Sequence, residues 1–365
     1  MLARWPGTRG KEYGAARNLI PMPYRIEEVE SPSDMREMSR TWESVLLASD
    51  ENDVFHTHDW MRVWWDIYGK GRKMLVLDVK EEGESVAIAP FMISYLGKIV
   101  RSGLLEFIGT GQSDRLGILV KRGSEGALQE VWRHLSQRGG WDSLDLRDMA
   151  GWGATSQSFR SAFPQAQIEE SPSPCLSLEG TYQEYLASLS SNTRHNLARC
   201  WKRLTNEKGV EFRTYKGVDD MDFCMRTLLK LNALRWEEHG TSTLTSERFE
   251  TFLKEALPLL AQKGYVRFHM LLSQGEPFSV TLGFEYRSKY LYYLSGFNPE
   301  FGAYGPGRSI LNKIIEDAFA RRLKDVDLLR GDEEYKYKFG ATDRKLVRGT
   351  VGKAGLKSRM PSLSK

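Results

Sequence analysis

The stretch VRFHMLLSQGEPFSVTLGFEYR, Val266 to Arg287, decides the fold because its pattern occurs twice in the chain. About 190 residues earlier, MLVLDVKEEGESVAIAPFMISY, Met74 to Tyr95, has the same form, with two apolar runs that meet at a Gly-Glu turn. Such runs predict a β-hairpin. A helical segment and a short strand follow each hairpin; the strands are DSLDLRD (Asp142 to Asp148) and DVDLLRGD (Asp325 to Asp332). The shared order indicates two copies of one α/β unit.

Length and composition agree with two such units. The chain has 365 residues, which is long for one core and suitable for two domains. Its 41% apolar and 11% aromatic residues are typical of a folded globular protein. The first 20 residues lack the apolar core of a secretion signal, and the longest apolar run, Val86 to Ile93, is too short to span a bilayer. We therefore expect a cytoplasmic protein without a membrane span.

The repeat divides the chain into four parts. The first copy is expected at residues 25–150 and the second at residues 181–352. Residues 151–180 are rich in Gly, Ser, Pro and Gln, a composition that favours a linker with some strand in it. Residues 353–365 are polar and basic, and we expect them to form a flexible tail.

A basic helix is expected at the start of the second copy, from about Tyr182 to Leu204. Its apolar positions recur at helical spacing, and its basic residues gather on another face: His195, Arg199, Lys202 and Arg203. A charged helix face of this kind is either solvated or in contact with an anionic ligand, and the sequence leaves both interpretations open.

A glycine-rich turn follows the predicted strand Lys289 to Phe297. In FGAYGPGRSILNKIIEDA, Gly302, Gly305 and Gly307 stand directly before a predicted helix. Glycines let the backbone approach a ligand, and a helix start provides unpaired N–H groups and the positive end of the helix dipole. The turn therefore predicts a cradle for an anion or a pyrophosphate, although Pro306 also suits a helix start for structural reasons alone.

Strands, a glycine turn that opens a helix, and a further strand together resemble the GNAT acyltransferase fold. SSNTRHNLARCWKRL, ALRWEEHG, YGPGRSILNKIIEDAFARRLKDVDLLRGDEEYKYKFG, FHTHDWMRVWW and GTGQSDRLGILV look like the CelD/BcsL branch, which is associated with cellulose biosynthesis and related to the tandem-GNAT FemABX aminoacyltransferases. The similarity covers roughly residues 35 to 350. It implies a mixed α/β fold of two tandem GNAT-like domains, each with a central mixed sheet flanked by helices.

The resemblance implies that the second domain binds an acyl-CoA donor, such as acetyl-CoA. In GNAT domains the thioester enters where two central parallel strands part, here Lys289 to Phe297 and Asp325 to Arg330. The donor-binding residues that follow from this comparison are Ser295, Gly296, Phe297, Gly305, Gly307, Arg308 and Ser309. The family motif begins with Arg or Gln, whereas this chain has Gly302 at that position, so Arg308 is the expected substitute.

Acyl transfer to an amine requires a base and a group that stabilises the oxyanion or protonates the thiolate. The catalytic candidates are Asp332 as base or orienter with Arg330 beside it, Tyr335 or Tyr304 as acid, and Lys336. Lys336 is chosen because YKYKFG resembles the Phe-Lys-x-x-Phe-Gly end of Fem-type transferases. Two structural alternatives remain: an Arg330–Asp332 ion pair, and a basic edge strand at YKYKFG.

The first copy has no compact glycine turn before its helix. We therefore expect a degenerate domain that shapes an acceptor cleft between the two copies. Asp114 in GQSD is either a residue of this cleft or a turn former.

Metal and disulfide sites are not expected. His56 and His58 have no second pair of ligands in view. The three cysteines form no CxxC pair and are odd in number.

The sequence therefore predicts an acyltransferase that uses acyl-CoA or a carrier thioester and an amine or hydroxyl acceptor. The acceptor would be a small molecule, a glycan or a lipid-linked group, and the branch resemblance implies exopolysaccharide or cell-envelope biosynthesis. The net charge of +4 does not require a nucleic acid partner. Two alternatives remain: a Fem-like transferase that uses aminoacyl-tRNA, with the basic helix as RNA contact, and a non-catalytic accessory protein that retains the fold.

Overall fold

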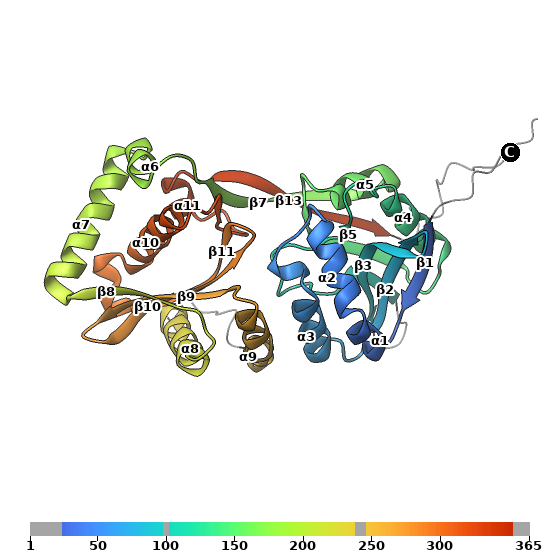
Figure 1. Ribbon diagram of the computed structural model, residues 1–365, viewed down its shortest axis with the longest axis horizontal. Helices are drawn as coiled ribbons and strands as arrows, with labels where there is room; N and C mark the ends of the chain where they lie inside the picture. Colours follow the sequence, from blue (N-terminus) through green and yellow to red (C-terminus); the bar gives the residue numbers. More distant parts are fainter. Residues whose placement is uncertain (1–23, 98–101, 238–245, 353–365) are drawn as a thin grey trace, which may run out of the picture.

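The computed structural model describes residues 24–97, 102–237 and 246–352. Figure 1 shows two α/β lobes side by side. The predicted tail, residues 353–365, lies outside the described residues. No helix within the described ranges is both long enough and apolar enough to cross a membrane.

The first unit begins with helices and continues with the predicted hairpin. Its elements are β1 (Tyr24–Val29), α1 (Pro32–Glu37), α2 (Ser39–Ala48), η1 (Val54–His56), α3 (His58–Tyr68), β2 (Lys73–Glu81), β3 (Glu84–Leu96), β4 (Ser102–Phe107), β5 (Leu119–Val120), α4 (Ala127–Gln137) and β6 (Ser143–Ala150).

The rest of the chain forms the connection and the second unit. Its elements are α5 (Ala154–Ala162), β7 (Gln167–Ser177), α6 (Tyr182–Ser188), α7 (Ser191–Lys208), β8 (Val210–Tyr215), α8 (Met221–Glu237), α9 (Glu247–Gln262), β9 (Val266–Ser273), β10 (Glu276–Tyr286), β11 (Lys289–Phe297), η3 (Pro299–Tyr304), α10 (Pro306–Ala320), β12 (Asp325–Asp327), α11 (Glu334–Lys338) and β13 (Thr342–Gly352).

Both predicted hairpins are confirmed, but each turns one residue before the expected Gly-Glu pair, since Glu84 and Glu276 already pair in the strands. The two turns have the same backbone conformation. In the β2–β3 turn, Glu82 and Gly83 have φ angles of 50° and 90°. In the β9–β10 turn, Gln274 and Gly275 have φ angles of 51° and 85°. Positive φ at both central residues is the type I′ arrangement, whose twist matches that of the flanking strands.

The predicted helix from Tyr182 to Leu204 is wrong in one respect, because two helices occupy this stretch. α6 begins with a capping box between Thr181 and Glu184. The chain then leaves the helical conformation, and the side chain of Ser190 accepts a hydrogen bond from the Thr193 N–H to start α7. A serine in this position satisfies an N–H group that a helix start leaves unpaired, and so fixes a new beginning.

One mixed sheet runs through both units. Among the described residues it has 13 strands in the order β1-β2-β3-β4-β6-β13-β7-β12-β11-β10-β9-β8, with β5 paired to β3 beside this path. The final strand β13 pairs with β6 of the first unit and with β7, so the two halves meet along it (Figure 1). The expected mixed α/β fold, with two units whose mixed sheet is flanked by helices, is confirmed.

The units also share an apolar core. Trp60 of α3 is fully buried and meets Phe252 of α9 edge to face, with ring centroids 4.7 Å apart. The same indole contacts Phe284 of β10 at 5.9 Å. Aromatic contacts of this geometry add to the stabilisation that burial provides. Sheet and core together therefore hold the two units in one orientation.

Candidate functional site

The site forms where β11 and β12 part. The two strands pair in parallel from Lys289 opposite Asp325 to Leu291 opposite Asp327, and β11 then continues to Phe297 without this neighbour. The predicted parting of these strands is confirmed, although β12 ends at Asp327 instead of Arg330. β12 is shorter because an Asp327 carboxylate oxygen accepts the Leu329 N–H at 2.9 Å, which turns the chain.

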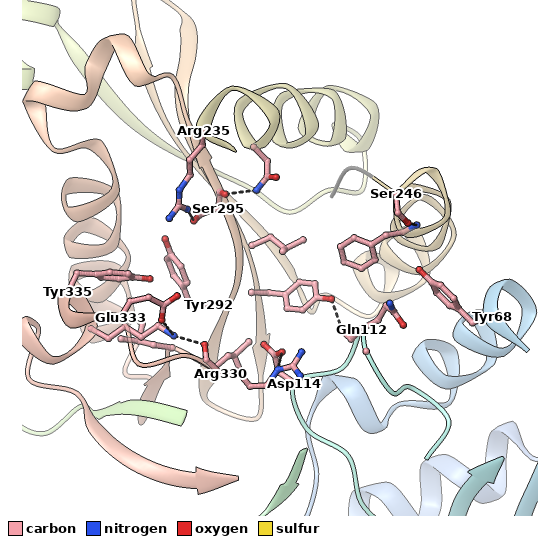
Figure 2. A pocket seen from close by; sticks show the side chains of 18 residues that line it. Tyr68, Gln112, Asp114, Arg235, Ser246, Tyr292, Ser295, Arg330, Glu333 and Tyr335 are labelled. Carbon is pink, nitrogen blue, oxygen red and sulfur yellow. Dashed lines mark hydrogen bonds and ion pairs between the residues drawn. The ribbon is translucent and has the colours of Figure 1, made fainter. Parts of the chain in front are cut away.

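Two cavities adjoin the free part of β11. The smaller has a volume of about 270 Å³ and surrounds the glycine turn. The larger, about 660 Å³, lies between the two units and is shown in Figure 2. Four residues line both cavities: Arg235, Tyr292, Ser295 and Tyr335. The two cavities therefore lie next to each other beside the free strand.

The glycine turn has the conformation that an anion cradle needs. Gly305 is the N-cap of α10 and has a φ of 65°, which favours glycine. A Cβ at Gly307 would meet no atom within 4 Å, so this part of the backbone faces open space. The N–H groups of Gly307 and Arg308 stand in the first helical turn, where a helix provides no acceptor. Ser309 adds a buried hydroxyl that has no partner among the described residues.

The three predicted donor residues at the end of β11 lie against α8. The Ser295 hydroxyl accepts a hydrogen bond from Arg235 at 2.8 Å, and the Ser295 carbonyl accepts one from the Asn232 amide at 2.9 Å. A Cβ at Gly296 would stand 2.4 Å from the Asn232 backbone nitrogen, so glycine is required for this close approach. Phe297 lies under the Arg235 guanidinium, which is 5.6 Å from the ring centroid.

The structure brings the predicted donor residues together. Ser295, Gly296 and Phe297 line the smaller cavity together with the glycine turn. Arg308 also lines it and is exposed, whereas Ser309 is buried behind the turn.

The catalytic candidates occupy different positions. Tyr335 lines both cavities, and burial raises the pKa of its phenol well above the ordinary value of 10.0. Lys336 is only 2% exposed, and its ammonium donates to the carbonyl oxygens of Arg330 at 2.6 Å and Gly331 at 3.2 Å. Glu333, 2.9 Å from this ammonium, also lines the larger cavity. The alternative of a basic edge strand at YKYKFG is wrong, because its first four residues lie in α11 and Phe339 caps that helix.

Arg330 does not pair with Asp332, so the alternative of an Arg330–Asp332 ion pair is also wrong. Its guanidinium lies 2.6 Å from Asp114 and 3.1 Å from Asp148, two carboxylates of the first unit. Asp332 is exposed and lines neither of the two cavities. Tyr304, the second candidate acid, contacts Arg203 of α7, whose guanidinium is 4.5 Å from the ring centroid.

Sequence reasoning missed several residues of the larger cavity. Tyr292, Arg235, Gln112 and Glu333 line it, and the Tyr293 hydroxyl donates to the Gln112 carbonyl at 2.7 Å across the two units (Figure 2). Of the two interpretations of Asp114, the structure supports the cleft residue, because Asp114 lines this cavity. The sequence around a strand residue such as Tyr292 does not show whether its side chain lines a cavity or packs in the core.

The histidines have ordinary structural partners. His56 pairs through Nδ1 with Asp53 at 2.9 Å, and His58 through Nε2 with the Met35 carbonyl at 2.8 Å. Within the ranges that the structure describes, no group of three or more His, Cys, Asp or Glu residues could hold a metal ion. The cysteines are free and buried.

Comparisons with known proteins agree with this geometry. Residues 191–337 match the model of a family described as an acetyltransferase (GNAT) domain. No curated protein matches the sequence. The crystal structure of FemX has a TM-score of 0.60 and 11% identity, with 88% of this chain and 96% of that chain covered.

Two further solved structures are similar to this chain. A conserved protein of unknown function from Bacteroides thetaiotaomicron has a TM-score of 0.55 and 10% identity, with 89% of this chain and 99% of that chain covered. A tandem GNAT protein from the clavulanic acid biosynthesis pathway has a TM-score of 0.46 and 12% identity, with 90% and 99% covered. Residues 191–337 thus match a GNAT acetyltransferase domain, in a chain whose fold is similar to that of FemX.

Proposed function

We propose that the chain transfers an acyl group from acyl-CoA, or from a carrier-bound thioester, to an amine or hydroxyl acceptor. The observation that carries this proposal is that two cavities lie next to each other beside the free part of β11 and share four lining residues. The donor would occupy the smaller cavity and the acceptor the larger one. The match of residues 191–337 to an acetyltransferase domain supports the same reaction class.

The donor phosphates would bind at the glycine turn. The first-turn N–H groups of Gly307 and Arg308 and the positive end of the α10 dipole favour an anion there. The open space at Gly307 leaves room for it. The acyl-bearing arm would then follow the unpaired edge of β11 toward the residues that the cavities share.

The chemistry requires two proton transfers. The acceptor nitrogen or oxygen attacks the thioester carbon, its bond to that carbon forms, and the carbon–sulfur bond breaks to release a thiolate. Tyr335 would give its proton to the thiolate, because its raised pKa keeps the phenol protonated at neutral pH. Glu333 would accept the proton that the acceptor loses, since it lines the larger cavity and its side chain is 56% exposed.

Two sequence candidates receive other roles in this proposal. Lys336 would position the chain, because its ammonium is committed to the carbonyls of Arg330 and Gly331 and to Glu333. Asp332 stays a prediction as base, and its exposed position outside both cavities favours Glu333 in its place. The acceptor would belong to exopolysaccharide or cell-envelope assembly, as the resemblance to the CelD/BcsL branch implies.

Gly307→Val tests the donor site. The new side chain would enter the cradle without meeting protein atoms, so acetyl-CoA binding measured by calorimetry should be lost while thermal unfolding stays unchanged. Gly305→Val is a poorer test, because a positive φ and the Cys200 sulfur 3.1 Å from the Cβ position predict strain. Gly139→Val, exposed and equally open in the first unit, is the matched control. If the folded Gly307→Val variant bound acetyl-CoA with the affinity of the wild type, the glycine turn would not be the donor site.

The tRNA-dependent alternative rests on α7. Its basic face consists of Arg199, Lys202 and Arg203. Arg203 donates a hydrogen bond to the Ala303 carbonyl at 3.2 Å, beside the glycine turn. We favour the small thioester, because one helix provides a short footprint for an RNA and the net charge is only +4. The discriminating measurement is ligand binding across a salt series, because RNA binding weakens steeply as the salt concentration rises.

A further inference from the structure

Two adjacent residues of the first unit, one acidic and one basic, each form an ion pair with a residue of the second unit. Asp114 accepts from Arg330, and the next residue, Arg115, donates to Asp327 at the end of β12. Arg115 also lies 3.5 Å from Asp53 of its own unit. Asp327 is fully buried, and Arg115 is 5% exposed. Charges this deeply buried are stable only when paired, so the units are held in one register here.

Arg330 connects this contact to the site. Its side chain reaches Asp114 and Asp148 of the first unit, and its main-chain carbonyl accepts the hydrogen bond from the buried Lys336. The segment that contains them, residues 328–336, contributes to the wall of the larger cavity and carries Tyr335. A change at the Arg330 guanidinium is therefore transmitted to the position of the proposed proton donor.

We propose that Asp148 of the first unit is a positioning residue for acyl transfer, which holds Arg330 and thereby fixes residues 328–336 against both cavities. The catalytic part of this statement rests on the proposed function. The mechanical part does not, because it concerns only the contact between the units. In this proposal the first unit helps to fix the position of residues that line the cavities of the second unit.

The backbone of Asp148 is arranged to present its carboxylate. Asp148 has a φ of 59°, a conformation that is uncommon for residues other than glycine. Its carbonyl accepts the Leu116 N–H at 2.9 Å, which fixes the strand against the loop that carries Asp114. Strained backbone at a contact of this kind persists when the surrounding structure over-determines it.

Protonation would weaken the contact in a defined pH range. Burial, reinforced by the Asp114 carboxylate and opposed by Arg330 and Arg147, raises the pKa of Asp148 to about 6. Burial also raises the pKa of Asp114, which Arg330, Arg115 and Lys336 oppose. Below about pH 6 Asp148 becomes neutral, and Arg330 loses one of its two ionic partners.

The effect on global stability has the opposite sign. A carboxylate whose pKa is raised in the folded state contributes stability that is complete below its ordinary value of 3.8 and is lost as the pH rises to about 6. Acidification through this range should therefore loosen residues 328–336 while the Asp148 titration itself favours folding. Local loosening without global unfolding distinguishes this contact from general acid denaturation.

Hydrogen exchange of the full-length chain at pH 5 to 8, corrected for the intrinsic rate, tests the contact without any substrate. In the wild type, exchange in residues 328–336 should rise about twofold to fivefold below pH 6, the change expected when one partly exposed ion pair is lost. Asp148→Asn should show the fast exchange at every pH. Asp325→Asn, which removes a comparable pair with Arg344 at 3.2 Å, should behave as the wild type.

Turnover provides the second readout. With acetyl-CoA as donor, kcat should fall below pH 6 in the wild type, and this acid limb should be absent in Asp148→Asn with donor affinity unchanged. If Asp148→Asn does not fold, Arg330→Gln removes the same contact from the other side. Exchange without a pH step in the wild type overturns the proposal. If hydrogen exchange shows the expected pH step but the protein transfers no acyl group, the contact between the units is supported and the proposed function is rejected.

Discussion

Replacing Lys336 by methionine separates a structural lysine from a catalytic one. Methionine keeps the length and the apolar packing of the side chain and removes the ammonium, which donates to two carbonyls and pairs with Glu333. Hydrogen bonds that involve a charged group contribute about 1.5–3 kcal/mol each. Because the variant no longer buries an ammonium, the two contributions do not add in full, and we expect a net loss of about 3 kcal/mol. The position is 2% exposed, so solvent screening is small.

Urea denaturation followed by circular dichroism measures this loss as a lower midpoint. Lys338→Met is the control in the same helix, since Lys338 is half exposed and its pair with Glu334 at 3.0 Å lies at the surface. Surface pairs of this kind contribute about 0–1 kcal/mol, so this variant should unfold near the wild-type midpoint. A Lys336→Met variant with the wild-type midpoint but without turnover would refute the reasoning, because that result assigns the ammonium to the chemistry.

Three further predictions concern the site. Tyr335→Phe should lower kcat about a hundredfold and leave donor affinity unchanged, because it removes only a proton donor; equal kcat values for the two proteins would exclude this role. Asp332→Asn should keep wild-type turnover while Glu333→Gln loses it, and the reverse ranking, measured by release of free thiol, would restore Asp332 as base. Glutamine at all three basic-face positions should hardly change acetyl-CoA affinity across a salt series, whereas salt-steep tRNA binding that disappears in this variant would favour the Fem-like alternative.

Local signals made half of the site predictable. The glycine turn could be placed because three glycines stand between an apolar strand and a predicted helix; the structure has Gly305 at the N-cap of α10, Gly307 in its first turn and Gly302 in η3. The hairpins could be placed because alternation and turn residues act within a few positions. The break between α6 and α7 also had a local signal, Ser190 followed by Thr193, which the continuous helical periodicity obscured.

The other half depends on contacts between distant residues. Arg235 meets Ser295 from a helix 60 positions earlier, and Arg330 meets Asp148 across 182 positions. A single sequence contains no rule that pairs these residues, because each arginine has other acidic and hydroxyl residues closer to it in the sequence. The sequence points to Asp332 as base because it ends the segment DVDLLRGD beside the parting strands, and it carries no signal for Glu333. The chain turns at Leu329 and Gly331, whose φ angles are 56° and 108°, and that turn places Glu333 in the cavity wall.

The position of β13 has a consequence for biosynthesis. β13, Thr342–Gly352, pairs with both β6 and β7 and is the last strand of the described chain. The ribosome therefore synthesises β6 and β7 long before their common partner. Until then each of these strands presents an unpaired edge, which is a template for association with other chains. A nascent chain halted before residue 342 should therefore aggregate, and a peptide of β13 supplied in trans should suppress this. The sheet that runs through both units therefore stays incomplete until residues 342–352 have been synthesised.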